Sequence, residues 1–101
     1  MNLGQQSLYT RDQIMQYQHY NLNNLSAGKV VEINLSGNAA NVKLMDSSNF
    51  LNYKNGRPHR YYGGYVTSSQ TRLKVPCSGN WYVTIDLGGR SGRVSSSVNV
   101  Y

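Results

Sequence analysis

Apolar side chains occupy every second position along several short segments of this chain. The pattern is clearest in residues 81–87, where polar residues separate Trp81, Val83, Ile85 and Leu87. Successive side chains of a β-strand point to opposite faces, so a period of two predicts a strand with one buried face. The same period recurs in residues 29–35, 41–44, 71–75 and 94–100. The alternation therefore predicts five half-buried strands.

Turn-forming residues separate these strands at near-regular intervals. Glycine, serine, asparagine and proline gather at residues 26–28, 36–38, 55–56, 76–80 and 88–92. We expect two weaker strands at residues 19–22 and 61–67, and no helical period follows residue 20. About seven or eight short antiparallel strands with this spacing predict an all-β protein, a single small, jelly-roll-like β-sandwich.

A polar extension, residues 1–18, precedes the predicted sandwich domain, residues 19–101. Residues 10–18 favour a short helix, because Thr10 suits the N-cap and Gln13 occupies the capping-box position. Cys77 is the single cysteine, which excludes an intramolecular disulfide. The chain also lacks an apolar signal segment and any run long enough to span a membrane. These features together favour a reducing, cytoplasmic location.

The net charge of +6 is unevenly distributed along the chain. Basic and acidic residues cancel in residues 1–50, whereas residues 51–101 carry seven lysines and arginines against Asp86 alone. Such asymmetry favours an anionic partner, which is a nucleotide, a nucleic acid or an acidic protein surface. The alternative is a cationic surface that only keeps the protein soluble.

The stretch NGRPHRYYGGYV, residues 55–66, combines aromatic rings with cations. The alternation places Val66 and Tyr62 toward the core, and Tyr61 and Tyr65 on the outer face. Two adjacent glycines, Gly63 and Gly64, invite a β-bulge that would shift this pattern. The outer rings and their basic neighbours suit stacking against a flat ligand, although tyrosine pairs also stabilise sheets.

A second basic segment, residues 88–93, is rich in glycine. Its backbone N–H groups can form a nest for a phosphate, which Arg90 and Arg93 would then hold. The alternative is a hairpin connection in which the glycines only supply positive φ angles. The candidate ligand-binding residues of the two segments are Arg57, His59, Arg60, Tyr61, Tyr65, Arg90 and Arg93.

Four strings in this order resemble a known family. They are LSGNAANV at 35–42, LMDSSNF at 44–50, YYGGYV at 61–66 and PCSGNWYVTIDLGG at 76–89. The chain resembles the 1883 family in the bacterial series of domains of unknown function, from about residue 19 to residue 100. The resemblance implies a β-sandwich found alone or in front of a TIR domain, a module that consumes NAD in bacterial defence. The family has no established catalytic or binding residues, so none is carried over.

The ionisable residues do not form a recognisable catalytic or metal site. The four acids are dispersed, and His19 and His59 lack the spacing of metal ligands. Cys77 and His59 could form a thiolate–imidazole pair, but Cys77 sits in a turn, without a helix N-terminus to lower its pKa. We therefore expect no enzyme, no metal and no cofactor.

The sequence thus predicts a non-enzymatic binding module that recognises an anionic or nucleotide-like ligand as the regulatory part of a bacterial defence or signalling system. A TIR effector domain is a candidate partner, and a membrane is not. The alternatives are general nucleic-acid binding, carbohydrate binding in which Tyr61 and Tyr65 stack on sugar rings, and protein docking, including docking to a second copy.

Overall fold

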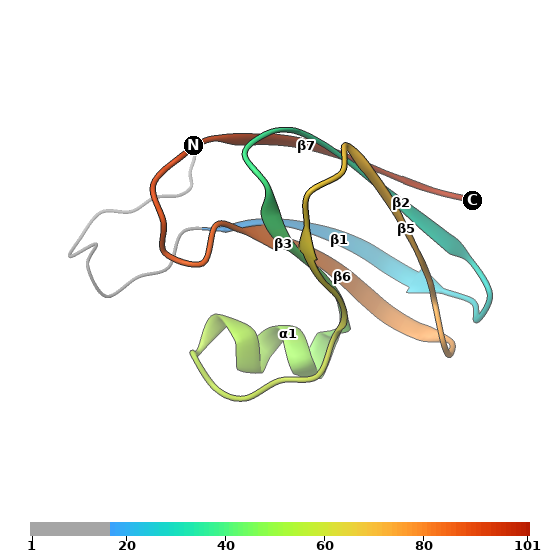
Figure 1. The fold of residues 1–101 in the computed structure, drawn as a ribbon. Coiled ribbons are helices and arrows are strands. Elements are labelled where there is room, and N and C mark those ends of the chain that lie inside the picture. Colours follow the sequence, from blue (N-terminus) through green and yellow to red (C-terminus); the bar gives the residue numbers. More distant parts are fainter. Residues whose placement is uncertain (1–16) are drawn as a thin grey trace.

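Residues 17–101, which the computed structural model describes, form a β-sandwich of two antiparallel sheets (Figure 1). Sheet A has the order β1 (Tyr17–Leu25), β6 (Gly79–Asp86), β3 (Ala40–Asp46) and β4 (Tyr62–Val66). Sheet B has the order β5 (Gln70–Lys74), β2 (Val30–Gly37) and β7 (Val94–Val100). The all-β sandwich expected from the alternation is confirmed.

The core lies between the two sheets and is built by the predicted inward positions. Val31, Ile33 and Leu35 of β2 face the positions contributed by β3 and β6. The residues that these two strands contribute to the core between the sheets are Ala40, Val42, Leu44, Trp81, Val83 and Ile85. The indole N–H of Trp81 donates to the carbonyl oxygen of Cys77 at 2.9 Å, so this large ring is buried with its polar group satisfied.

Strand β1 begins at Tyr17, inside the segment that we assigned to the extension. Residues 17 and 18 of the expected N-terminal helix are therefore in a strand, and residues 10–16 of that helix lie outside the described part of the chain. The β-bulge expected at Gly63 and Gly64 is wrong, because the register of β4 on β3 runs through both glycines without a shift. The irregularity lies in β1 instead, between Asn21 and Asn23.

One helix, α1 (Ser47–Lys54), follows β3, and this corrects the expectation that no helix occurs after residue 20. It lies on the face of sheet A that points away from sheet B (Figure 1). Asp46 both ends β3 and caps the helix, since its Oδ1 accepts from the N–H of Asn49 at 3.0 Å.

The helix is held by tertiary contacts rather than by a helical pattern. Phe50 and Tyr53 are its buried residues, and with Met45 of β3 they form a small second core. Phe50 stacks on Tyr82 with ring centroids 4.1 Å apart. Serine and asparagine occupy four of the eight helical positions and have low helix propensity, so a sequence with two buried positions gives almost no periodic signal.

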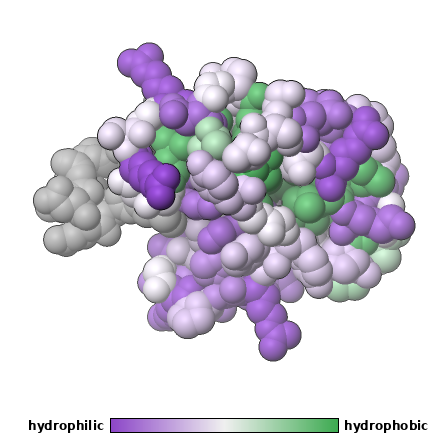
Figure 2. All heavy atoms as spheres, viewed as in Figure 1, coloured by the Kyte–Doolittle hydropathy of each residue, from purple (hydrophilic) through white to green (hydrophobic). Residues whose placement is uncertain are grey.

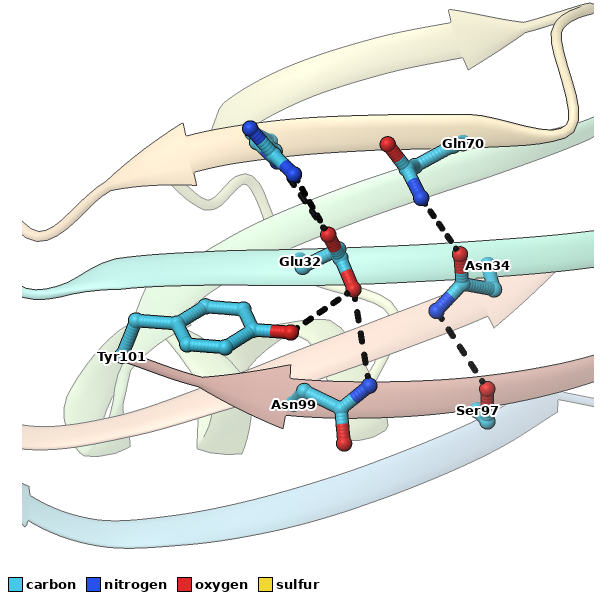
Figure 3. A network of polar contacts seen from close by, with 7 residues as sticks. Glu32, Asn34, Gln70, Ser97, Asn99 and Tyr101 are labelled. Atoms are coloured by element: carbon cyan, nitrogen blue, oxygen red, sulfur yellow. Dashed lines mark hydrogen bonds and ion pairs between the residues drawn. The ribbon is translucent and has the colours of Figure 1, made fainter.

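The outer face of sheet B is polar and carries rows of hydrogen-bonded side chains across its strands (Figure 3). In one row Asn34 accepts from Gln70 at 3.1 Å and donates to Ser97 at 3.5 Å. In the other row the carboxylate of Glu32 accepts from Arg72 at 2.9 Å and from Tyr101 at 3.2 Å.

Among the described residues, no helix is long and apolar enough to cross a membrane.

Candidate functional site

The segment between α1 and β4, residues 55–61, is tied to both ends of the helix. The N–H of Arg57 donates to the carbonyl oxygen of Asn52 at 2.8 Å, and the N–H of Arg60 donates to Oδ1 of Asn49 at 2.7 Å. The residues at 57 and 60 are both exposed. The backbone is therefore anchored while two guanidinium groups reach solvent from the outer side of sheet A.

His59 is held between this segment and the sheet. Its Nδ1 lies 3.0 Å from the carbonyl oxygen of Arg57, and its Nε2 lies 3.2 Å from Nζ of Lys43. A lysine ammonium can only donate, so Nε2 is the acceptor and Nδ1 carries the hydrogen that bonds Arg57. Both ring nitrogens are thus engaged within the protein, and neither is directed at Cys77, which is exposed in the β5–β6 turn.

Lys43 is a site residue that the sequence reasoning missed. Its Nζ lies 4.5 Å from the ring centroid of Tyr61 and 5.3 Å from that of Tyr53, within the range of a cation–π contact. The alternation marks position 43 only as an outward polar residue of a strand. Its partners come from α1 and the segment after it, so no local pattern reveals them.

The tyrosines of strand β4, and Tyr61 directly before it, are exposed to solvent. Tyr61 and Tyr65 are 43% and 62% exposed, in accord with their expected outward positions. Tyr62 corrects the prediction of a core residue, because it is 50% exposed. It has the inward parity and lies 6.2 Å from the Trp81 ring, but β4 is the last strand of sheet A and nothing beyond it completes the cover.

Gly63 separates the two outer tyrosines and lies opposite Lys43 in the register. Its φ angle is +119°, and a Cβ placed on it would lie 2.2 Å from the carbonyl oxygen of Val42. Only glycine fits this backbone without a clash. We use the name tyrosine–cation surface for six residues: Lys43, Arg57, His59, Arg60, Tyr61 and Tyr65.

Arg90 and Arg93, the other two predicted residues, lie in the separate β6–β7 loop and are exposed. No hydrogen bond or ion pair joins them to the tyrosine–cation surface within residues 17–101. The N–H of Arg93 donates to Oδ1 of Asn38 at 2.7 Å, and Gly88 and Gly89 have φ angles of +66° and +84°. These features fit the alternative in which this loop is a connection between two strands and its glycines supply positive φ angles.

The β6–β7 loop encloses an anion of the protein itself. The carboxylate of Asp86 accepts from the Gly88 N–H at 2.8 Å, from Asn41 at 2.9 Å and from the Tyr53 hydroxyl at 2.6 Å. Burial, followed by the bond to Asp86, raises the pKa of the Tyr53 phenol, which keeps its proton as the donor. Asp86 therefore anchors the C-terminal end of α1 to sheet A.

An open pocket of about 360 Å³ lies beside this loop, at one end of the sandwich. Arg93 lines it, but no member of the tyrosine–cation surface does. The lining residues are Tyr17, Gln18, Ile85, Asp86, Leu87, Gly92, Arg93, Val94 and Ser95. The aromatic and basic residues that the sequence singled out at 57–65 thus occupy an exposed strand and loop rather than a cavity.

The acids in residues 17–101 are all engaged internally. Glu32 forms the single ion pair of this region, with Arg72, while Asp46 caps α1 and Asp86 anchors it. Lys43, Arg57 and Arg60 consequently have no carboxylate partner within the described residues. The same region contains no group of three histidine, cysteine or acidic side chains placed to hold a metal ion.

Comparison with known proteins gives a family and a fold. Residues 15–101 match the family described as "Domain of unknown function (DUF1883)". A search of curated proteins finds no significant match. The structure is similar to that of PliG, a periplasmic lysozyme inhibitor of g-type lysozyme from Aeromonas hydrophila, with a TM-score of 0.61 and 19% identity over 86% of this chain and 77% of that one. At this identity the likeness concerns the fold.

Proposed function

The chain belongs to the DUF1883 family, and we propose that it is a non-enzymatic binding module that recognises an anionic partner through the tyrosine–cation surface. The observation that carries the proposal is the exposure of Tyr61 and Tyr65 beside cations that have no carboxylate partner within residues 17–101. Aromatic faces with nearby arginines suit a flat anionic group, because ring stacking on a base contributes about 1–3 kcal/mol.

The tyrosine–cation surface combines one cation held in place by its neighbours with two exposed arginines. Lys43 is held by His59 and the Tyr61 ring, so its charge is placed without a further loss of side-chain freedom on binding. Arg57 and Arg60 remain extended into solvent and can close on an anion. These contacts favour a nucleotide-like or otherwise anionic ligand over a neutral sugar, which would not need the guanidinium groups.

The fold supports a recognition role rather than deciding the ligand. PliG, whose fold is similar, is an inhibitor of g-type lysozyme, so this sandwich can serve binding without catalysis. In a bacterial defence or signalling system, such a module would act in the cytoplasm as the regulatory part beside an effector such as a TIR domain.

The test is a thermal-shift screen of nucleotides, cyclic dinucleotides, NAD, oligonucleotides and short oligosaccharides, followed by titration of any ligand. The double variant Arg57→Ala/Arg60→Ala should weaken binding by at least about tenfold, equivalent to 1.4 kcal/mol. Its melting temperature should stay close to that of the parent, since both residues are exposed.

The matched control is Lys29→Ala/Lys74→Ala, which removes the same charge from exposed positions away from the surface. It should leave the affinity nearly unchanged. Equal affinities for the parent and the Arg57/Arg60 variant would overturn the proposal. Titration at two salt concentrations separates the ligand classes, because a nucleic acid loses affinity in proportion to the phosphates neutralised, with a log–log slope of about 0.9 per contact.

A further inference from the structure

The sandwich has four edge strands, and three of them carry features that discourage pairing with another chain. β1 contains the irregularity at Asn21–Asn23. β5 bears the charges of Arg72 and Lys74. Charged residues and bulges are the usual means by which edge strands avoid foreign partners.

β7 is protected by side chains of β1. Nε2 of Gln18 donates to the carbonyl oxygen of Val94 at 2.8 Å, and the hydroxyl of Tyr20 donates to the carbonyl oxygen of Ser96 at 2.9 Å. Two outward carbonyl groups of this strand are thereby occupied.

β4 lacks all of these features. Its sequence, Tyr62–Val66, contains no charge and no proline, and its register on β3 is regular. Within the described residues, no strand pairs with β4 on its other side. In an antiparallel ladder every second residue turns its N–H and C=O away from the neighbour, so β4 offers a row of backbone donors and acceptors to solvent.

The side chains along this edge indicate what it can receive. Tyr61, Tyr62 and Tyr65 are all exposed, and tyrosine and arginine are enriched where proteins dock. Figure 2, viewed as Figure 1, shows hydrophobic residues reaching the surface between hydrophilic ones.

We propose that the open edge of β4 pairs with an extended, acidic segment of a partner protein, which adds a fifth strand to sheet A. The inference rests on the proposed function and names the partner class. The acidic character follows from Lys43, Arg57 and Arg60, which flank the edge without carboxylate partners in residues 17–101. Backbone pairing supplies affinity, while the rings and cations select the side chains.

Two other occupants fit the edge less well. A second copy of this chain would bring two identical sets of cations into one interface, which like-charge repulsion opposes. A nucleic acid presents phosphate acceptors but no regular alternation of donors and acceptors, so it would leave the carbonyl groups of β4 unpaired.

The experiment uses the seven-residue peptide Glu-Val-Glu-Val-Glu-Val-Glu, acetylated and amidated, and follows backbone amides by NMR up to millimolar peptide. Amides of residues 62–66 should shift and exchange more slowly. Two further peptides carry N-methyl groups on the valines or on the glutamates. Because alternate amides of a paired strand point in opposite directions, one methylated peptide should lose at least about tenfold in affinity and the other should not.

Variants provide a second readout. Tyr65→Ala should weaken peptide binding, whereas Leu51→Ala, which removes a similarly exposed apolar side chain from α1, should not. A lysine-valine peptide of the same length should bind more weakly than the glutamate peptide. Sedimentation of the free protein should show a monomer.

Strand pairing is overturned if the glutamate peptide leaves β4 unshifted, if both methylated peptides bind alike, or if the protein dimerises through β4. It is also overturned if a thymidine oligonucleotide shifts β4 and the peptide does not. If both methylated peptides bind alike but Arg57→Ala/Arg60→Ala still weakens them, the strand inference fails and the proposed function stands. Undiminished binding to this double variant instead overturns the proposed function.

Discussion

At the scale of single residues, Glu32 shows how a charge is kept on a buried position of a sheet. It is 6% exposed, yet its carboxylate accepts from Arg72, Tyr101 and Asn99 (Figure 3). The hydrogen bond from Arg72, the largest of these effects, lowers the pKa of Glu32. A carboxyl whose pKa is lower in the folded than in the unfolded state stabilises the fold in its ionised form.

We therefore predict that protonation of Glu32 accounts for part of the loss of stability at acidic pH. Its contribution to stability is complete above the unfolded pKa and is lost as the pH falls from about 5 through the folded pKa. The free energy of unfolding, measured with urea at neutral and acidic pH, should therefore fall less for Glu32→Gln than for the parent. Part of the decline should remain, because Asn49 also lowers the pKa of Asp46. Identical pH profiles of the two proteins would contradict this account.

At the scale of elements, the regular pairing of β4 with β3 depends on one glycine, Gly63, at a position that no other residue fits. Gly63 has a positive φ angle and approaches the carbonyl oxygen of Val42. Gly64 also has positive φ, yet a Cβ placed on it would meet nothing within 4 Å. The sequence suggested a bulge at this pair of glycines, whereas in the structure Gly63 lets β4 lie close against β3.

Gly63→Ala should therefore destabilise the domain by more than about 1 kcal/mol, because strained backbone adds to the contact with Val42. The matched control is Gly79→Ala at the start of β6, where φ is ordinary and the nearest atom, Nε1 of Trp81, would lie 3.8 Å from the new Cβ. Its stability should stay within about 0.5 kcal/mol of the parent. Equal urea midpoints for the two variants would show that β4 tolerates a side chain there.

At the scale of the whole molecule, the sandwich is closed by side chains along one side and left open along the other. Gln18 and Tyr20 of β1 bond Val94 and Ser96 of β7, which joins the two sheets where no backbone ladder connects them. On the opposite side β4 and β5 are edge strands of different sheets. Within residues 17–101, β4 therefore has no strand partner beyond β3.

The closure can be tested with Ser96→Ala. This change removes the hydroxyl that bonds the Tyr20 hydroxyl at 2.7 Å and also donates to Oε1 of Gln18. The loss should lower the free energy of unfolding by about 1–2 kcal/mol. Ser95→Ala, on the exposed face of the same strand, should change it by less than about 0.5 kcal/mol. Similar losses in both variants would mean that the side-chain hydrogen bonds between β1 and β7 do not contribute to stability.

The sequence by itself determined the strands and the inward residues of β2, β3 and β6. The period of two is a local property of the chain, so Val31, Val83 and Ile85 could be assigned to the core without knowledge of their neighbours. The outward positions of Tyr61 and Tyr65 followed from the same rule. Four short strings likewise indicated the family from about residue 19 to residue 100, and the family model matches residues 15–101.

Tertiary structure alone decided the features that depend on which segments meet. α1 forms because Phe50 and Tyr53 find Tyr82 and Asp86 on the outer face of sheet A, not because its residues favour a helix. Tyr62 points inward yet stays half exposed, because β4 ends its sheet. The place of Lys43 in the candidate site was hidden for the same reason: its contacts lie outside its own strand, and alternation along one strand carries no information about them.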